Sequence, residues 1–166
     1  MSSYSKLIVF VLALLIISAA VIFIDSSVDN INKTMPEISD LIVNGDKDYN
    51  EAVQLLNDRD FYNAMAKAES AGNNYENSLS KLQDIKNEFS DDINDIQKEY
   101  IDTVINELNL KIQAVDKLKL SIENLQVYSN YTGSTYGSEA NDLIYEAVQY
   151  QNERDSIVKD NPNLFK

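Results

Sequence analysis

The side chains of this chain that could do chemistry are almost all carboxylates. The sequence holds 27 Asp and Glu against 14 Lys and Arg, and it has no Cys and no His. Thiol nucleophiles, Ser-His-Asp triads, haem ligation by His and most zinc sites are therefore excluded. We predict no catalytic residue, no metal site and no cofactor, and we expect a protein that is not an enzyme.

One run of oxygen ligands imitates the start of a calcium loop. Asn44, Asp46 and Asp48 have the alternate spacing of the first ligands in an EF-hand. However, Tyr49 stands where that loop needs Gly for its sharp turn, and Leu55 stands where it needs a bidentate Glu. The run therefore does not predict a metal site, and the sequence has no Gly-rich phosphate-binding loop.

A segment near the C-terminal third, 128–138, is rich in Gly, Ser, Thr and Tyr, and we predict that it forms a long loop. Its tyrosines Tyr128, Tyr131 and Tyr136 make it the candidate interaction loop, because Tyr among small polar residues suits contact surfaces. The alternative interpretation is that these rings cap the end of a helical core.

The elements that must position these residues begin with an apolar run, 7–24, which only Ser18 interrupts. A helix of these 18 residues is about 27 Å long, close to the hydrocarbon thickness of a bilayer. Lys6 precedes the run and acidic residues follow it, so the positive-inside rule predicts a single-pass signal-anchor in the cell membrane with residues 1–6 in the cytoplasm. The alternative is a cleaved signal peptide, because the small residues 18–20 resemble a cleavage site.

Two Asn-x-Thr triplets lie on the predicted outer side of the membrane. They begin at Asn32 and Asn130, and two such triplets are close to chance expectation in an Asn-rich chain. They are candidate glycosylation sites in an organism that has the machinery.

The exported part is strongly acidic. Residues 25–166 carry 13 basic and 27 acidic side chains, so their net charge is 13 − 27 = −14. That field repels nucleic acid and anionic lipid headgroups, and we predict no nucleic-acid partner. The absence of Cys excludes a disulfide framework, and four Gly and two Pro leave few of the turns that a sheet-rich fold needs.

Apolar residues at three- and four-residue steps predict helices along the whole exported part. A juxtamembrane helix within 25–46 is expected to be interrupted at Pro36 and to stop at Asn44 and Gly45. A second helix should start near Asp48 and end at the polar run 57–60. The chain is thus predicted to contain a cytoplasmic N-terminus (1–6), a transmembrane anchor (7–24), a juxtamembrane helix and linker (25–46), an extracytoplasmic helical bundle (47–160) and a tail (161–166).

Two coiled-coil-like seams of period 3.5 follow. The first covers 61–89, or two shorter helices if 72–74 breaks it; the second covers 101–125 with Lys111 inside it. A last amphipathic helix covers 140–157. We predict an all-α chain whose seams pack within one antiparallel bundle, with a homodimer joined through parallel seams as the alternative. The leucines expected in the core include Leu82, Leu108 and Leu118.

One stretch has small and aromatic residues at positions typical of a known repeat. The pattern is similar to the small and aromatic positions of a tetratricopeptide helical hairpin, and it is formed by Ala52, Leu55, Phe61, Ala64 and Ala71. That resemblance implies a tight hairpin, and such repeats stack into a concave protein-binding face. The match covers about 20 residues, and no second copy follows 34 residues on.

These observations favour a membrane-anchored, extracytoplasmic helical protein that acts by protein binding or scaffolding at the cell envelope, with an unknown protein partner. The alternative is a helical bundle that senses a small ligand and relays the signal to a membrane partner. A binding module should expose an apolar or Tyr-rich patch. A sensor should hold a pocket between helices that is lined by polar groups.

Overall fold

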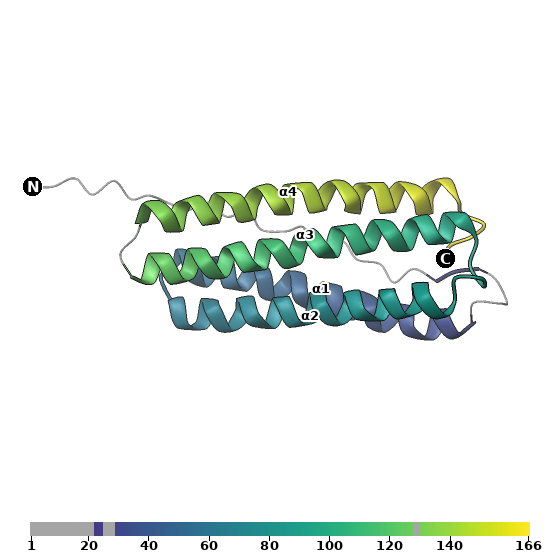
Figure 1. Ribbon diagram of the computed structural model, residues 1–166, viewed down its shortest axis with the longest axis horizontal. Helices are drawn as coiled ribbons and strands as arrows, with labels where there is room; N and C mark the ends of the chain where they lie inside the picture. Colours follow the sequence, from purple (N-terminus) through teal and green to yellow (C-terminus); the bar gives the residue numbers. More distant parts are fainter. Residues whose placement is uncertain (1–21, 25–28, 128–129) are drawn as a thin grey trace, which may run out of the picture.

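The computed structural model describes residues 22–24, 29–127 and 130–166, and it is a bundle of long helices (Figure 1). The all-α prediction and the helical bundle are confirmed. The helices run alternately up and down, and their bounds are α1 (Asp29–Asn57), α2 (Phe61–Glu88), α3 (Asp95–Gln126) and α4 (Asn130–Asp160).

Local capping fixes where α2 and α3 begin. Asp60 is the N-cap of α2, and its side chain accepts a hydrogen bond of 3.3 Å from the Asn63 backbone N–H. Asn94 and Gln97 form a capping box at the start of α3, each side chain accepting from the other's backbone N–H. The predicted break at 57–60 is therefore confirmed, since the α1–α2 turn lies there.

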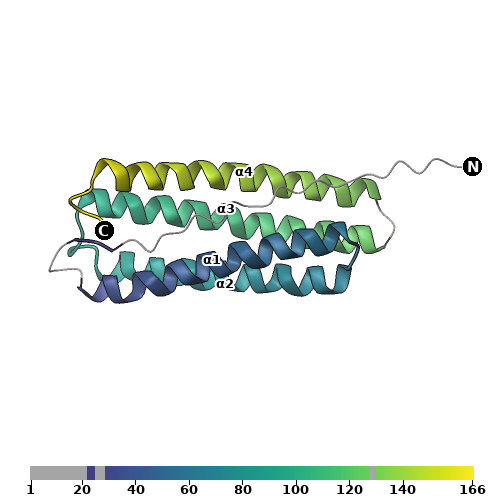
Figure 2. The same ribbon diagram turned by 180° about the vertical axis from the view of Figure 1, so that it is seen from behind.

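The four helices form two hairpins, each of which packs more closely within itself than against the other. We name α1 and α2 hairpin A, and α3 and α4 hairpin B. Each pair packs along its length, and the hairpins meet mainly through α2 and α3; α1 touches α3 at a few positions, and no Cα of α1 or α2 comes within 8 Å of one in α4. One end, the tip, carries the α1–α2 and α3–α4 turns, whereas the opposite end, the base, carries the α2–α3 turn and the C-terminus (Figure 2).

The predicted leucines lie in the core: Leu82, Leu108 and Leu118 are fully buried. Hairpin A is close-packed because α2 turns three alanines toward α1, and small side chains let two helix backbones approach. These fully buried alanines are Ala64, Ala68 and Ala71.

The predicted helix end at Asn44 and Gly45 is wrong, because α1 continues through both residues and through Pro36. Gly45 serves close packing instead of a turn. A Cβ atom there would lie 2.5 Å from Cε1 of the Tyr75 ring, so only a glycine lets α1 and α2 pack this closely. Likewise α2 runs unbroken through 72–74.

The predicted loop at 128–138 is also wrong from residue 130 on, where α4 begins. Gly133 again permits a close approach, since a Cβ there would lie 2.5 Å from Cγ of Leu125. The Ser121 hydroxyl donates a 2.7 Å hydrogen bond to the Gly133 carbonyl. Small residues in this segment therefore join α4 to α3.

Residues 22–24 are extended, so the predicted anchor helix does not include its last three residues. They pair antiparallel with 164–166: the Ile24 backbone N–H donates to the Leu164 carbonyl at 2.8 Å. Phe23 is buried against the rings of Tyr100 and Phe165.

The remainder of the predicted anchor, residues 7–21, lies outside the described residues. Within 22–24, 29–127 and 130–166, none of the helices has the length and apolar character needed to cross a membrane. The predicted tail, 161–166, packs on the base of the bundle through Phe165.

Two glycines in helix interiors test this packing. Gly45→Ala should lower the free energy of unfolding, because overpacking costs about 1–3 kcal/mol and outweighs the gain in helix propensity. Gly72→Ala is the matched control: its Cβ would lie 3.4 Å from Val115 Cγ1, an ordinary contact, so stability should rise by about 0.5–1 kcal/mol. Urea unfolding of the full-length protein, followed by circular dichroism, measures both; equal effects would contradict the close contact at Gly45.

Candidate functional site

The centre of the bundle contains a buried network of charged side chains to which all four helices contribute. Lys111 of α3 lies between two carboxylates, with its Nζ 2.8 Å from Asp46 Oδ1 of α1 and 2.8 Å from Glu107 Oε1 of α3. Arg154 of α4 donates to Glu107 Oε2 at 3.0 Å. The Tyr75 hydroxyl of α2 donates to the same Asp46 oxygen at 2.7 Å.

Burial makes this network unusual among the ion pairs of the chain. The side chains of Lys111 and Glu107 are each 1% exposed and that of Asp46 is 4% exposed, whereas Lys86 and Asp102 are about half exposed. Two anions and two cations balance, so the network is neutral as a whole. Neutrality and direct contact offset part of the cost of placing these charged side chains away from water.

The network shifts the proton equilibria of its members. Burial alone lowers the pKa of Lys111, but the neighbouring carboxylates of Glu107 and Asp46 outweigh it and the pKa is raised. Arg154 follows the same pattern, with Glu107 as its main partner. Burial raises the pKa of Tyr75 well above its usual range, and the Asp46 charge adds to that shift.

Aromatic and amide groups surround the charges. Burial also raises the pKa of Tyr49, whose hydroxyl has no hydrogen-bond partner among the described residues. The Gln97 side-chain nitrogen is likewise buried without a partner there. Burial, the largest cause, raises the pKa of Tyr100 to about 12.

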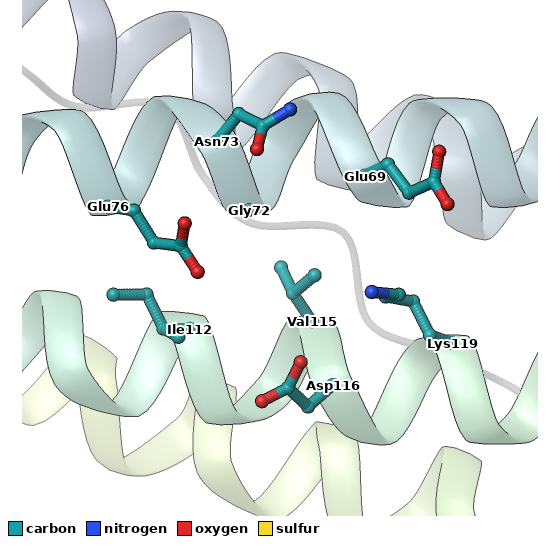
Figure 3. A pocket seen from close by; sticks show the side chains of 8 residues that line it. All are labelled: Glu69, Gly72, Asn73, Glu76, Ile112, Val115, Asp116 and Lys119. Carbon is teal, nitrogen blue, oxygen red and sulfur yellow. The ribbon is translucent and has the colours of Figure 1, made fainter.

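A shallow groove lies on the surface between α2 and α3, with a volume of about 80 Å³. Val115 and Gly72 face each other across it, and the Glu76 carboxylate is directed toward α3 (Figure 3). Glu69, Glu76 and Asp116 line it, and none of these three forms an ion pair with another described residue. No cluster of three metal-ligating side chains occurs within the described ranges.

The tip of the bundle exposes aromatic and apolar side chains. Tyr62 at the start of α2 is 83% exposed, Tyr131 at the start of α4 is 85% exposed, and Val127 just after α3 is 73% exposed. All three follow or precede the turns that meet at this end. Tyr145, 65% exposed on α4, lies away from the tip.

The tyrosines of the predicted interaction loop differ in position and burial. Tyr131 is exposed on the first turn of α4, and Tyr136 is half-buried with the Lys117 ammonium 5.5 Å from its ring centroid. Tyr128 lies outside the described residues. The three tyrosines therefore do not share a loop, and sequence reasoning did not single out Tyr62.

The two sequon asparagines differ as well. The Asn32 side chain binds the backbone of Phe23 twice: its Oδ1 accepts from the N–H and its Nδ2 donates to the carbonyl, both at 2.7 Å. A glycan on that nitrogen would replace one of its hydrogens next to a packed segment. The Asn130 side chain lies outside the described residues. Glycosylation of either stays a prediction.

The buried network was missed at the level of sequence, although two signals pointed to it. Lys111 interrupts an otherwise apolar seam, and Arg154 lies on the apolar face of the last helix. A charge at a core position predicts a buried partner. Glu107 lies four residues before Lys111, which is a local helical spacing, but no local pattern predicts the second partner, Asp46, which is 65 residues away.

Comparison with known proteins finds no relative: no family model, no curated protein and no solved structure matches the chain. The likeness of residues 52–71 to a tetratricopeptide hairpin therefore stays a prediction.

The raised pKa values predict that the fold fails in alkali. Tyr49, Tyr75, Tyr100 and Lys111 hold their protons more tightly when folded, so their contribution is complete below about pH 10 and is lost as the pH rises through the folded pKa values. Each such group should lower the free energy of unfolding by about 1.4 kcal/mol per pH unit in that range.

Helix content and tyrosinate absorbance between pH 8 and about 12 measure this effect. Tyr49→Phe removes a hydroxyl without a partner, so it should preserve stability at pH 7 and move the alkaline transition upward. Tyr62→Phe, at an exposed ring, is the control and should change neither. Full ionisation of the buried tyrosines without loss of helix would contradict the network.

Proposed function

We propose that this chain is a membrane-anchored, extracytoplasmic helical protein that acts by protein binding or scaffolding at the cell envelope. The observation that carries the proposal is the exposed tip. Tyr and apolar side chains are enriched where proteins bind one another, and single large exposed rings at one end of a bundle are available to a partner.

The polarity of the bundle supports this proposal. Residues 22–24, which follow the apolar segment, lie at the base, and Tyr62, Val127 and Tyr131 lie at the tip. A helix of 28 residues, such as α2, is about 42 Å long. An anchor in residues 7–21 would therefore hold the base near the membrane and present the tip about 40 Å away from it.

The alternative function, sensing of a small ligand, is favoured by the groove between α2 and α3. Its carboxylates would suit a cation. However, Glu69, Glu76 and Asp116 are exposed, so the groove would bury little of a bound molecule, whereas sensor sites bury most of their ligand. Binding through the tip therefore has the stronger support.

The anchor can be tested by extraction. As a helix, the 15 residues 7–21, all apolar except Ser18, would be about 22 Å long, which a locally thinned bilayer accommodates, so we expect the full-length protein to stay in membranes after a carbonate wash. Cleavage after Ala20 would instead leave the 22–24 segment in the bundle and release a soluble protein that begins at Val21. Recovery of that form would replace the anchor with a signal peptide.

The tip can be tested by substitution. The double variant Tyr62→Ser and Tyr131→Ser should keep the melting temperature, because both rings are exposed, and should weaken capture of the partner at least tenfold, as loss of interface tyrosines does. Tyr145→Ser is the control, since it removes another exposed ring that lies away from the tip. The measurement is the amount of each partner protein that co-purifies from detergent-solubilised membranes with the wild type, with the double variant and with the control.

Two results would count against the tip as the contact surface. One is equal capture of every neighbour by the wild type, the double variant and the control. The other is equal loss in the double variant and in Tyr145→Ser, which would assign the effect to exposed aromatic area in general.

A further inference from the structure

Hairpins A and B are each packed more closely internally than against one another. Inside hairpin A, a Cβ on Gly45 would lie 2.5 Å from the Tyr75 ring, and inside hairpin B a Cβ on Gly133 would lie 2.5 Å from Leu125. Gly72 faces the other hairpin, and its Cβ would lie 3.4 Å from Val115. A methyl group at Gly72 would therefore make an ordinary contact between the hairpins, whereas one at Gly45 or Gly133 would overlap its neighbour within a hairpin.

Most of the charged side chains that line the groove between the hairpins are acidic. Glu69 and Glu76 of α2 lie across the groove from Asp116 of α3, and only Lys119 among the groove residues carries a positive charge (Figure 3). Like charges that lie close together repel one another, and water and salt weaken that repulsion at exposed sites. Among the described residues in the middle of the α2–α3 contact, these exposed side chains form no ion pair between the hairpins, whereas Lys86 and Asp102 form one near the base.

The buried charges favour contact between the hairpins, because each hairpin has an unbalanced charge in its interior. Among the described residues, hairpin A buries one charged side chain, Asp46, with a charge of −1. Hairpin B buries the anion Glu107 and the cations Lys111 and Arg154, a net charge of +1. Joined, the hairpins are neutral inside; apart, each would keep a charge that has lost its partner.

The base holds the hairpins together independently of this pair. Phe23 contacts Tyr100 of α3 and Phe165, while its backbone is bound by Asn32 of α1. The short α2–α3 turn lies at the same end. Nothing comparable joins α1 to α4, which have no Cα pair within 8 Å.

We propose that the bundle opens at its tip as two intact hairpins that pivot at the base, and that the Asp46–Lys111 ion pair is the lock that holds it closed. The Tyr75 hydroxyl, bound to the same Asp46 oxygen, fixes the carboxylate that Lys111 must meet. Opening would separate the exposed tip residues of the two hairpins and expose the inner faces of α1 and α4.

The absence of Cys makes the test direct, because spin labels can be attached at introduced cysteines alone. The tip pair is Asp58→Cys with Val127→Cys, and the base pair is Asn87→Cys with Asn163→Cys; all four positions are exposed. Distance distributions are measured by pulsed electron resonance on the full-length protein in detergent micelles, in the wild type and in each lock variant.

The proposal predicts a pattern across four variants. Lys111→Met and Asp46→Asn should each make the longer tip distance the majority population while the base distance and the helix content stay unchanged. The double variant Asp46→Asn with Lys111→Met removes one charge from each hairpin and should close the tip again. Lys86→Met, which breaks the exposed pair with Asp102 between the same hairpins, should leave the tip closed.

Three results would overturn the lock. The first is an unchanged tip distance in both single variants. The second is broadening of tip and base distances together with loss of helix, which would show that the bundle unfolds as one unit. The third is a double variant as open as the single variants, which would show that closure does not depend on charge balance.

Discussion

The pair of Asp46 with Lys111 is the constraint on which the centre of the bundle depends. Moving two charges out of water is costly, and only direct contact and neutralisation offset that cost. To supply Asp46, α1 must pass straight through Gly45 and pack against the Tyr75 ring. To balance the second carboxylate, Glu107, α4 must deliver Arg154. The buried charges of α3 are therefore met by Asp46 of α1 and Arg154 of α4, and Tyr75 of α2 binds the same Asp46 oxygen.

The helices could be predicted from sequence because buried apolar residues recur at three- and four-residue steps along each of them. The turn at 57–60 was also predictable, since Asp60 there caps a free backbone N–H of α2. Two predicted ends failed for one reason. Gly45 and Gly133 were read as turn signals, but both allow a second helix to come close, and sequence does not distinguish these two uses of glycine.

The site was less predictable than the fold, because its members are distant in sequence. Lys111 stood out as an interruption, yet its partner Asp46 is 65 residues away and resembled a fragment of a metal loop. Hydrophobicity has a similar ambiguity at 22–24. An apolar residue satisfies a membrane or a protein core equally well, and only the pairing with Phe165 shows that Phe23 belongs to the bundle.

Closure of the bundle thus balances two kinds of electrostatic interaction that respond differently to the surroundings. Repulsion between exposed carboxylates such as Glu76 and Asp116 is screened over about 8–10 Å at physiological salt. The buried pair is sheltered from ions and keeps its strength. In a chain with a net charge of −13, rising ionic strength therefore weakens the repulsion between these surface carboxylates, while the buried ion pair between the hairpins is little affected.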